Sequence, residues 1–129
     1  DMPAKINKYL KSTGQAEITD KGQMVRAILE SLARKYGQVL RMLEDLQGKK
    51  IDVLHIVGGG IQNELLNQFT ADATGCTVIT GPVEATASGN IVVQAMATGE
   101  VKDLWHARQI VRNSYEIKTY QPQNPQAWK

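Results

Sequence analysis

Three consecutive glycines followed by an asparagine form the part of this sequence best suited to contact a ligand. Gly58, Gly59 and Gly60 come after the apolar run at 51–57, and Asn63 lies three residues further on. A glycine turn between a strand and a helix exposes backbone N–H groups and lets another molecule approach closely. The start of a helix favours anions, and an asparagine amide both donates and accepts hydrogen bonds. The segment is a candidate nucleotide or phosphate site; alternatively, the glycines only turn the chain and Asn63 caps the helix.

Two common nucleotide-binding patterns do not fit this segment. The Walker loop needs a Gly-Lys pair followed by Ser or Thr, and the sequence has none. The dinucleotide fingerprint needs a third glycine where Asn63 stands. Glu84 lies too far downstream to serve as its ribose-binding acid, and Gly81-Pro82 interrupts the strand before it. A dinucleotide site is therefore disfavoured.

The other histidine, cysteine and aspartate residues are not spaced in a way that suggests catalysis or metal binding. His55 lies in the apolar run and is expected to be a hydrogen-bonded core residue, whereas His106 has no carboxylate or serine partner at a useful spacing. Cys76 is the only cysteine, which excludes an internal disulfide and a cysteine zinc site, and it is expected to be a small buried hydrophobe. Asp52 is the only aspartate near the glycine turn. No metal site is therefore predicted.

Composition narrows the class of protein. The 129 residues are 42% hydrophobic and 22% charged with a net charge of +2, as in a soluble globular protein. No apolar run approaches the roughly 18 residues that a membrane span needs. The basic residues form no stripe, so nucleic acid is not an expected partner. The single cysteine suits a reducing cytoplasm. Because the sequence opens on Asp1, it is expected to be a piece of something longer.

Apolar spacing and capping residues predict the element order α-α-β-α-β-α-α, an α/β class. We expect helices near 3–13, 20–48, 61–75, 84–98 and from 103, with strands at 51–57 and 76–80. The capping residues that mark these helices are Asp20, Gly48, Gly75, Gly99 and Asp103.

The apolar residues also predict what these elements pack against. The long helix carries a stripe wider than a coiled-coil seam, so it should pack on a sheet or on several helices. The strand at 51–57 is apolar on both faces, which is typical of a central, covered strand. The helix at 84–98 should bury one face, and Trp105 should fill a gap between helix and sheet. The residues expected to be buried on the helix at 84–98 are Ala87, Ile91, Val92, Ala95 and Met96.

Two stretches, "IVGGGIQNELLNQFTADATG" and "GPVEATASGNIVVQAMATGEV", resemble the C-terminal domain of the FGGY carbohydrate kinases. The upstream "MPAKINKYLKSTGQ" and "ILESLARKYGQVLRMLEDL" resemble the rhamnulokinase branch of that family in particular. The resemblance implies part of an actin-like, ribonuclease H-like ATPase domain over residues 1–120, with a mixed sheet covered by helices. Two prolines and no periodicity predict that residues 121–129 form a tail that lies on a surface or is mobile. The resemblance also implies that Gly59 and Gly60 lie against the nucleotide and that Asn63 meets the adenine edge.

The resemblance further implies that the catalytic machinery lies upstream of this chain. The family's catalytic aspartate, phosphate loops and magnesium carboxylates have no counterpart here, so no catalytic residue is expected. The whole enzyme would transfer the γ-phosphate of ATP, with Mg²⁺, to the C1 hydroxyl of L-rhamnulose. The alternatives are a xylulose, fuculose or glycerol kinase of the same family, or a non-catalytic nucleotide-binding or interaction module. The isolated piece should be inactive and, with an exposed sheet edge, should self-associate.

Overall fold

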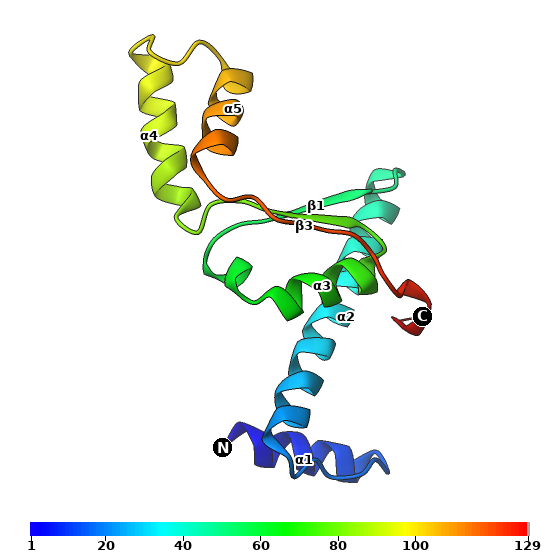
Figure 1. Ribbon diagram of the computed structural model, residues 1–129. Coiled ribbons are helices and arrows are strands. Elements are labelled where there is room, and N and C mark those ends of the chain that lie inside the picture. Colours follow the sequence, from blue (N-terminus) through cyan, green and yellow to red (C-terminus); the bar gives the residue numbers. More distant parts are fainter. Residues whose placement is uncertain (129) are drawn as a thin grey trace.

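The computed structural model describes residues 1–128, which form helices on and around a small three-stranded sheet (Figure 1). In chain order the elements are α1 (Met2–Ser12), α2 (Lys21–Gln47), β1 (Val53–Ile56), η1 (Gly59–Gln62), α3 (Glu64–Thr74), β2 (Thr77–Thr80), α4 (Ala85–Ala97), α5 (Leu104–Ser114), β3 (Thr119–Tyr120) and η2 (Pro125–Trp128). The predicted order and the α/β class are confirmed, while β3 and the two single-turn 3₁₀ helices, η1 and η2, were not predicted.

The helix ends lie where the capping residues predict them. Asp20 Oδ1 accepts a hydrogen bond of 2.8 Å from the Gln23 N–H at the start of α2. Asp103 Oδ1 does the same for the His106 N–H at the start of α5, also at 2.8 Å. Gly48 ends α2 in the left-handed conformation, with a φ of 64°. These signals are local, so a single sequence is enough to find them.

The sheet has the strand order β1-β2-β3, with β1 parallel and β3 antiparallel to β2. The mixed sheet is therefore confirmed, but the expectation that the strand at 51–57 is central is wrong. The central strand is β2, and β1 is at the edge of the sheet within the described residues. The Thr77 N–H bonds to the Asp52 carbonyl and the Gly81 N–H to the Ile56 carbonyl. The backbone N–H and C=O groups of alternate residues in a strand point to opposite edges. Those of Asp52 and Ile56 point toward β2, so those of Val53, His55 and Val57 point to the free edge.

The best-packed part of the molecule is the seam between α2 and α3. Ala33 and Leu40 of α2 are buried there, and Gly37 lies between them in sequence. A β-carbon on Gly37 would lie only 3.0 Å from the Ala73 carbonyl oxygen, so this close approach of the two helices favours glycine. The buried hydrophobic residues are Met24, Ala33, Leu40, Phe69, Ala71, Cys76, Val78, Val101 and Ala107.

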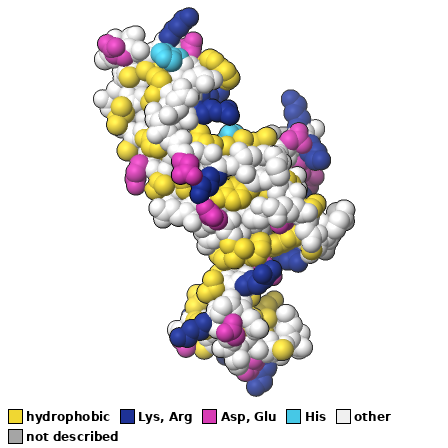
Figure 2. Space-filling view, in the orientation of Figure 1, with side chains coloured by type: hydrophobic (Ala, Val, Ile, Leu, Met, Phe, Trp, Pro, Cys, Tyr) yellow, Lys and Arg dark blue, Asp and Glu magenta, His cyan; other side chains and the backbone are white. Residues whose placement is uncertain are grey.

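Much of the predicted apolar surface is nevertheless exposed. The hairpin of α4 and α5 projects from the opposite side of the sheet to α3 (Figure 1), and Figure 2 shows hydrophobic side chains on its surface. Ala87 and Ile91 are exposed, so the expected burial of these two residues is wrong; Val92, Ala95 and Met96 are half-buried. Trp105 is 68% exposed and fills no gap. Periodicity identifies side chains that share a face, but it does not show that this chain contains anything to cover that face.

Candidate functional site

The three glycines of the turn have different structural reasons to be glycine. Gly58 has a φ of 83°, and its N–H donates to the Pro82 carbonyl at 3.0 Å, so its conformation disfavours any other residue. Gly59 and Gly60 have no such φ, and a β-carbon on either would meet nothing within 4 Å. Within the described residues, neither backbone conformation nor packing requires glycine at 59 or 60.

Asn63 caps α3, as the simpler interpretation of the sequence proposes. Its Oδ1 accepts a hydrogen bond of 3.0 Å from the Leu66 N–H. The glycines themselves start η1, in which the Asn63 N–H bonds to the Gly60 carbonyl at 3.2 Å. The α-helical dipole therefore begins at Asn63 and not at the glycines, which weakens the expected attraction of phosphate to the turn. Among residues 1–128, the Asn63 amide nitrogen has no hydrogen-bond partner and is free to donate.

An open groove of about 840 Å³ lies between the glycine turn and α2. Leu29 and Leu32 of α2 and Leu66 of α3 give it apolar walls. Gly59 and Gly60 line the groove together with the polar side chains of Gln62, Asn63 and Glu64. The structure thus brings the three predicted site residues onto one groove that has apolar walls and a polar edge. Such a combination suits a planar heterocycle with hydrogen-bonding groups on its rim.

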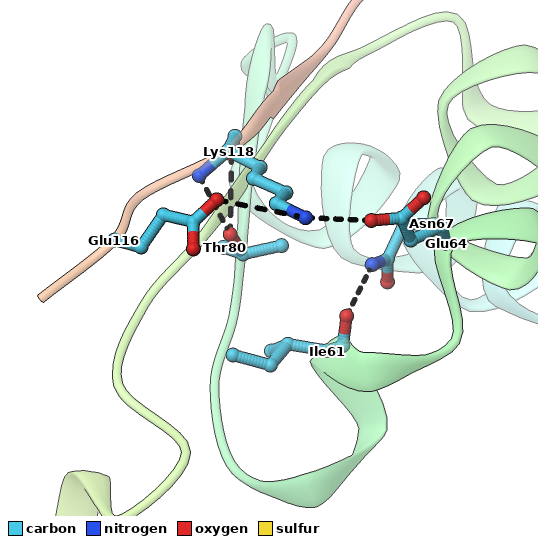
Figure 3. Close-up of polar contacts among 6 residues, drawn as sticks. All are labelled: Ile61, Glu64, Asn67, Thr80, Glu116 and Lys118. Atoms are coloured by element: carbon cyan, nitrogen blue, oxygen red, sulfur yellow. Dashed lines mark hydrogen bonds and ion pairs between the residues drawn. The ribbon is translucent and has the colours of Figure 1, made fainter.

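A smaller polar pocket of about 370 Å³ adjoins this groove and shares Gln62 and Glu64 with it. Figure 3 shows Lys118 reaching across this pocket to Glu64, with 2.6 Å between Nζ and Oε1, while Glu116 lies 3.6 Å from the same nitrogen. The hydrogen bond and charge of Lys118 lower the pKa of the Glu64 carboxyl, and Glu64 raises the pKa of Lys118. Lys118 therefore pairs with one polar side chain at the rim of the groove.

The remaining sequence candidates do not line the groove. His55 is exposed and borders a second, apolar pocket of about 500 Å³ that adjoins the groove at Gly60 and Leu66, so its expected place in the core is wrong. The His106 Nδ1 accepts from the Lys102 N–H at 3.2 Å at the start of α5. Cys76 is buried, as predicted, and burial raises the pKa of its thiol. Residues 1–128 contain no cluster of His, Cys, Asp or Glu able to hold a metal ion.

Several groove residues were not identified from the sequence. Leu29 and Leu32 belong to the stripe of α2, but nothing in their spacing shows that the glycine turn lies opposite them. Lys118 lies 54 residues from its partner Glu64, a distance over which spacing carries no signal. The signal that did exist was local: two glycines and an asparagine placed between a strand and a helix.

Comparison with known proteins identifies relatives. Residues 1–98 match the C-terminal domain of the FGGY family of carbohydrate kinases. The chain is 49% identical over 128 residues to a rhamnulokinase of Bacteroides thetaiotaomicron, covering 99% of this chain and 26% of that protein. It is 42% identical over 124 residues to a rhamnulokinase of Bacillus subtilis strain 168, covering 96% of this chain and again 26% of the relative. The chain thus spans about a quarter of the length of these two curated relatives.

Proposed function

Because this chain belongs to the FGGY family of carbohydrate kinases, we propose that it is the C-terminal, ATP-binding part of a rhamnulokinase-like sugar kinase. The whole enzyme transfers the γ-phosphate of ATP to the C1 hydroxyl of L-rhamnulose, with Mg²⁺. The identities of 49% and 42% to two rhamnulokinases, over nearly the whole chain, support this choice of substrate. Xylulose, fuculose and glycerol are the competing acceptors within the family.

The observation that carries the nucleotide assignment is the contrast among the three glycines. Gly58 is needed for the turn, whereas Gly59 and Gly60 border an open groove with no structural reason to lack a side chain. A bound ligand that approaches the backbone closely supplies that reason. In this arrangement the adenine ring lies between the glycine turn and Leu29 and Leu32.

Asn63 then has two roles that do not compete. Its oxygen caps α3 by accepting from the Leu66 N–H. Its amide nitrogen donates to a ring nitrogen on the adenine edge, which supplies only an acceptor at that position. The cap fixes the side-chain rotamer, so the donor is held in place before the nucleotide arrives.

The other parts of the reaction belong to the longer protein in this proposal. Phosphoryl transfer needs a base for the sugar hydroxyl and metal ions on the transferring phosphate. The described residues offer no carboxylate cluster for magnesium, so this chain alone should not consume ATP in a rhamnulose-dependent way. A coupled assay of the purified chain tests this, and measurable turnover would contradict it.

None of the helices in residues 1–128 is long and apolar enough to span a bilayer. We place the whole enzyme in the cytoplasm.

The nucleotide assignment is tested in the full-length enzyme with three variants. Gly59→Ala puts a methyl group into the groove, and it should weaken ADP binding while leaving the unfolding midpoint unchanged. Asn63→Ser keeps a capping oxygen but loses the amide donor, and it should raise the Kd for ADP about three- to tenfold. Asn63→Ala should lose both the affinity and some helix stability. Unchanged ADP affinity in Gly59→Ala and Asn63→Ser would show that the adenine lies elsewhere.

The sugar is tested by comparing kcat/KM for L-rhamnulose, xylulose, fuculose and glycerol with the same enzyme preparation. L-rhamnulose should be the best acceptor. A higher kcat/KM for one of the other three would replace the proposed substrate, and no turnover with any of them would favour a non-catalytic nucleotide-binding module.

We also propose that the rest of the longer protein covers the exposed apolar surface described above. The free edge of β1 and the stripe along α2 are adjacent, because Leu54 and Ile56 line the same apolar pocket as Tyr36 and Leu43. When the chain is produced alone, this surface should cause self-association. Sedimentation at rising concentration measures it, and a strictly monomeric chain would contradict the proposal.

A further inference from the structure

The C-terminal residues 121–128, called the strap below, lie across α3 and reach α2. Their principal anchor is Asp72, a carboxylate on α3 that is only 8% exposed. Its Oδ1 accepts from the backbone N–H groups of Gln123 at 2.6 Å and Asn124 at 3.2 Å, and from the Gln68 amide at 3.2 Å. The Gln68 amide also donates to the Gln121 carbonyl at 2.9 Å. A buried carboxylate with three hydrogen bonds is costly to leave unpaired, so the strap has a defined seat.

Aromatic and cationic side chains join the end of the strap to both helices. The Trp128 ring lies 5.2 Å from the Phe69 ring of α3, centroid to centroid. On α2, Arg34 lies over Trp128 at 5.4 Å and donates to the Trp128 carbonyl at 3.3 Å, while Arg26 lies over Phe69 at 5.2 Å. The strap therefore contacts the two helices that also form the walls of the groove.

The strap and the groove lie on opposite flanks of the seam between α2 and α3. Leu32 faces the groove, and Arg34, two residues later, points about 200° away around the helix toward the strap. The buried residues Ala33 and Gly37 lie between these directions, against α3. An added β-carbon on Gly37 would lie 3.0 Å from the Ala73 carbonyl oxygen, so the two helices approach closely at a point between the strap and the groove. A change in helix tilt that loosens the strap therefore changes the separation between Leu32 and the glycine turn.

We propose that the strap is a positioning element for the nucleotide: by clamping α3 to α2 on one flank, it sets the width of the groove on the other. Asp72 and Trp128 are the positioning residues, and neither touches the nucleotide. The inference rests on the proposed function, because it concerns the groove assigned there to adenine. The strap lies outside residues 1–98, the part of the chain that matches the family domain.

Binding is measured in the full-length enzyme, by calorimetry with MgADP as the probe. Asp72→Asn and Trp128→Ala should raise the Kd about five- to tenfold, the range of a modest coupling between two sites. The KM for ATP should rise in the same variants, and the KM for the sugar should not. Gln126→Ala is the matched control, since Gln126 is an exposed residue of the strap itself, and it should bind MgADP like the unaltered enzyme.

A second measurement needs no variant. Coupling between two sites is reciprocal, so MgADP should slow hydrogen exchange at the Gln123 and Asn124 amides by the same factor. The amides of α1, which lies far from the strap (Figure 1), serve as the internal reference. This measurement remains available where a variant fails to fold.

The outcomes separate the two proposals. Normal MgADP affinity in the Asp72 and Trp128 variants, with unchanged exchange in the strap, would overturn the positioning role while leaving the nucleotide site intact. Affinity that responds to the strap variants but not to Gly59→Ala would place the nucleotide outside the groove and overturn both. A fall in affinity matched by a fall in sugar affinity would indicate general loosening of the fold and would also overturn the positioning role.

Discussion

The layer of α2 and α3 and the hairpin of α4 and α5 are both rich in apolar residues, but the layer buries those at its inner seam, whereas the hairpin buries few. In the layer, Ala33, Leu40, Phe69 and Ala71 are all at most 7% exposed. On the hairpin, Ile91, Val93, Leu104 and Trp105 are all more than half exposed. The inner seam is covered by segments of this chain, including the strap, whereas the outer stripe of α2 and the hairpin have few partners within the described residues. This difference separates what the chain stabilises by itself from what the longer protein is proposed to cover.

The largest expected difference comes from truncating a leucine in each region. Leu40→Ala, in the seam, should lower the free energy of unfolding by about 2–4 kcal/mol, through lost burial and a cavity. Leu104→Ala, at a residue 57% exposed, should change it by less than about 0.5 kcal/mol in the same chain. Chemical denaturation measures both. Equal losses in the free energy of unfolding would contradict the difference between the two regions. A larger loss for Leu104→Ala in the full-length protein than in this chain would support the proposal that the longer protein covers the hairpin.

A smaller difference is expected when a helical glycine in each region is replaced by alanine, because the two replacements should change stability in opposite directions. Gly37→Ala places a β-carbon 3.0 Å from a backbone oxygen and should destabilise the chain by about 1–3 kcal/mol. Gly89→Ala, in open space on α4, should stabilise the chain by about 0.5–1 kcal/mol through helix propensity. Thermal unfolding of the two variants gives the signs. If both alanines destabilise, α4 is packed more closely than its exposure indicates.

Cys76 tests the packed region chemically. It is 2% exposed, and its thiol donates to the Ile51 carbonyl at 2.9 Å. Burial raises the pKa of the thiol, so its alkylation rate should rise at a higher pH than that of an ordinary cysteine, and denaturant should accelerate it. Since the folded state favours the neutral thiol, stability should fall as the pH rises above the thiol's unfolded pKa. Rapid alkylation in the folded chain at neutral pH would show that the contact between Cys76 and Ile51, beside the start of β2, opens readily.

The smallest effect is expected at the rim of the groove. In Lys118→Met, the pKa of Glu64 should return from its lowered value toward that of an ordinary glutamate, because its hydrogen-bond donor is gone. The lowered pKa stabilises the fold above the unfolded pKa, and this contribution is lost as the pH falls through the folded value. Both side chains are largely exposed, so solvent screening keeps the effect on stability small. An NMR titration of the Glu64 carboxyl would show no shift between the two proteins if the ion pair does not form in solution.

The features that could be predicted from the sequence are those that depend on residues close together in the chain. Asp20, Gly48, Gly75 and Asp103 mark helix ends through contacts within a few residues, and all four are confirmed. The predicted family is also confirmed, because the segments around the glycine turn carry the resemblance. The roles of Gly59, Gly60 and Asn63 toward a nucleotide stay predictions, although the structure does place them on one groove.

What could not be predicted depends on contacts between distant residues. Spacing alone does not show that β3 pairs with β2, or that Asp72 accepts from amides some fifty residues away. The expectation of a central strand at 51–57 was wrong for a related reason: an apolar pattern on both faces is the same whether a neighbouring strand belongs to this chain or not. The predicted burial of Ala87, Ile91 and Trp105 failed for the same reason, because a prediction from periodicity assumes that another element packs on the apolar face.

The two hydrogen bonds that join Thr80 to Lys118 have a further consequence for how this fold can be altered. The Thr80 N–H donates to the Lys118 carbonyl, and the Lys118 N–H donates to Thr80 Oγ1, both at 2.9 Å across 38 positions of the sequence. Everything between these residues, including α4 and α5, leaves the sheet and returns to the same point. Doubling the length of such an excursion adds only about 0.6 kcal/mol of closure entropy. Insertions into the segment between Thr80 and Lys118, or its replacement by another segment, should therefore leave the register of the sheet unchanged.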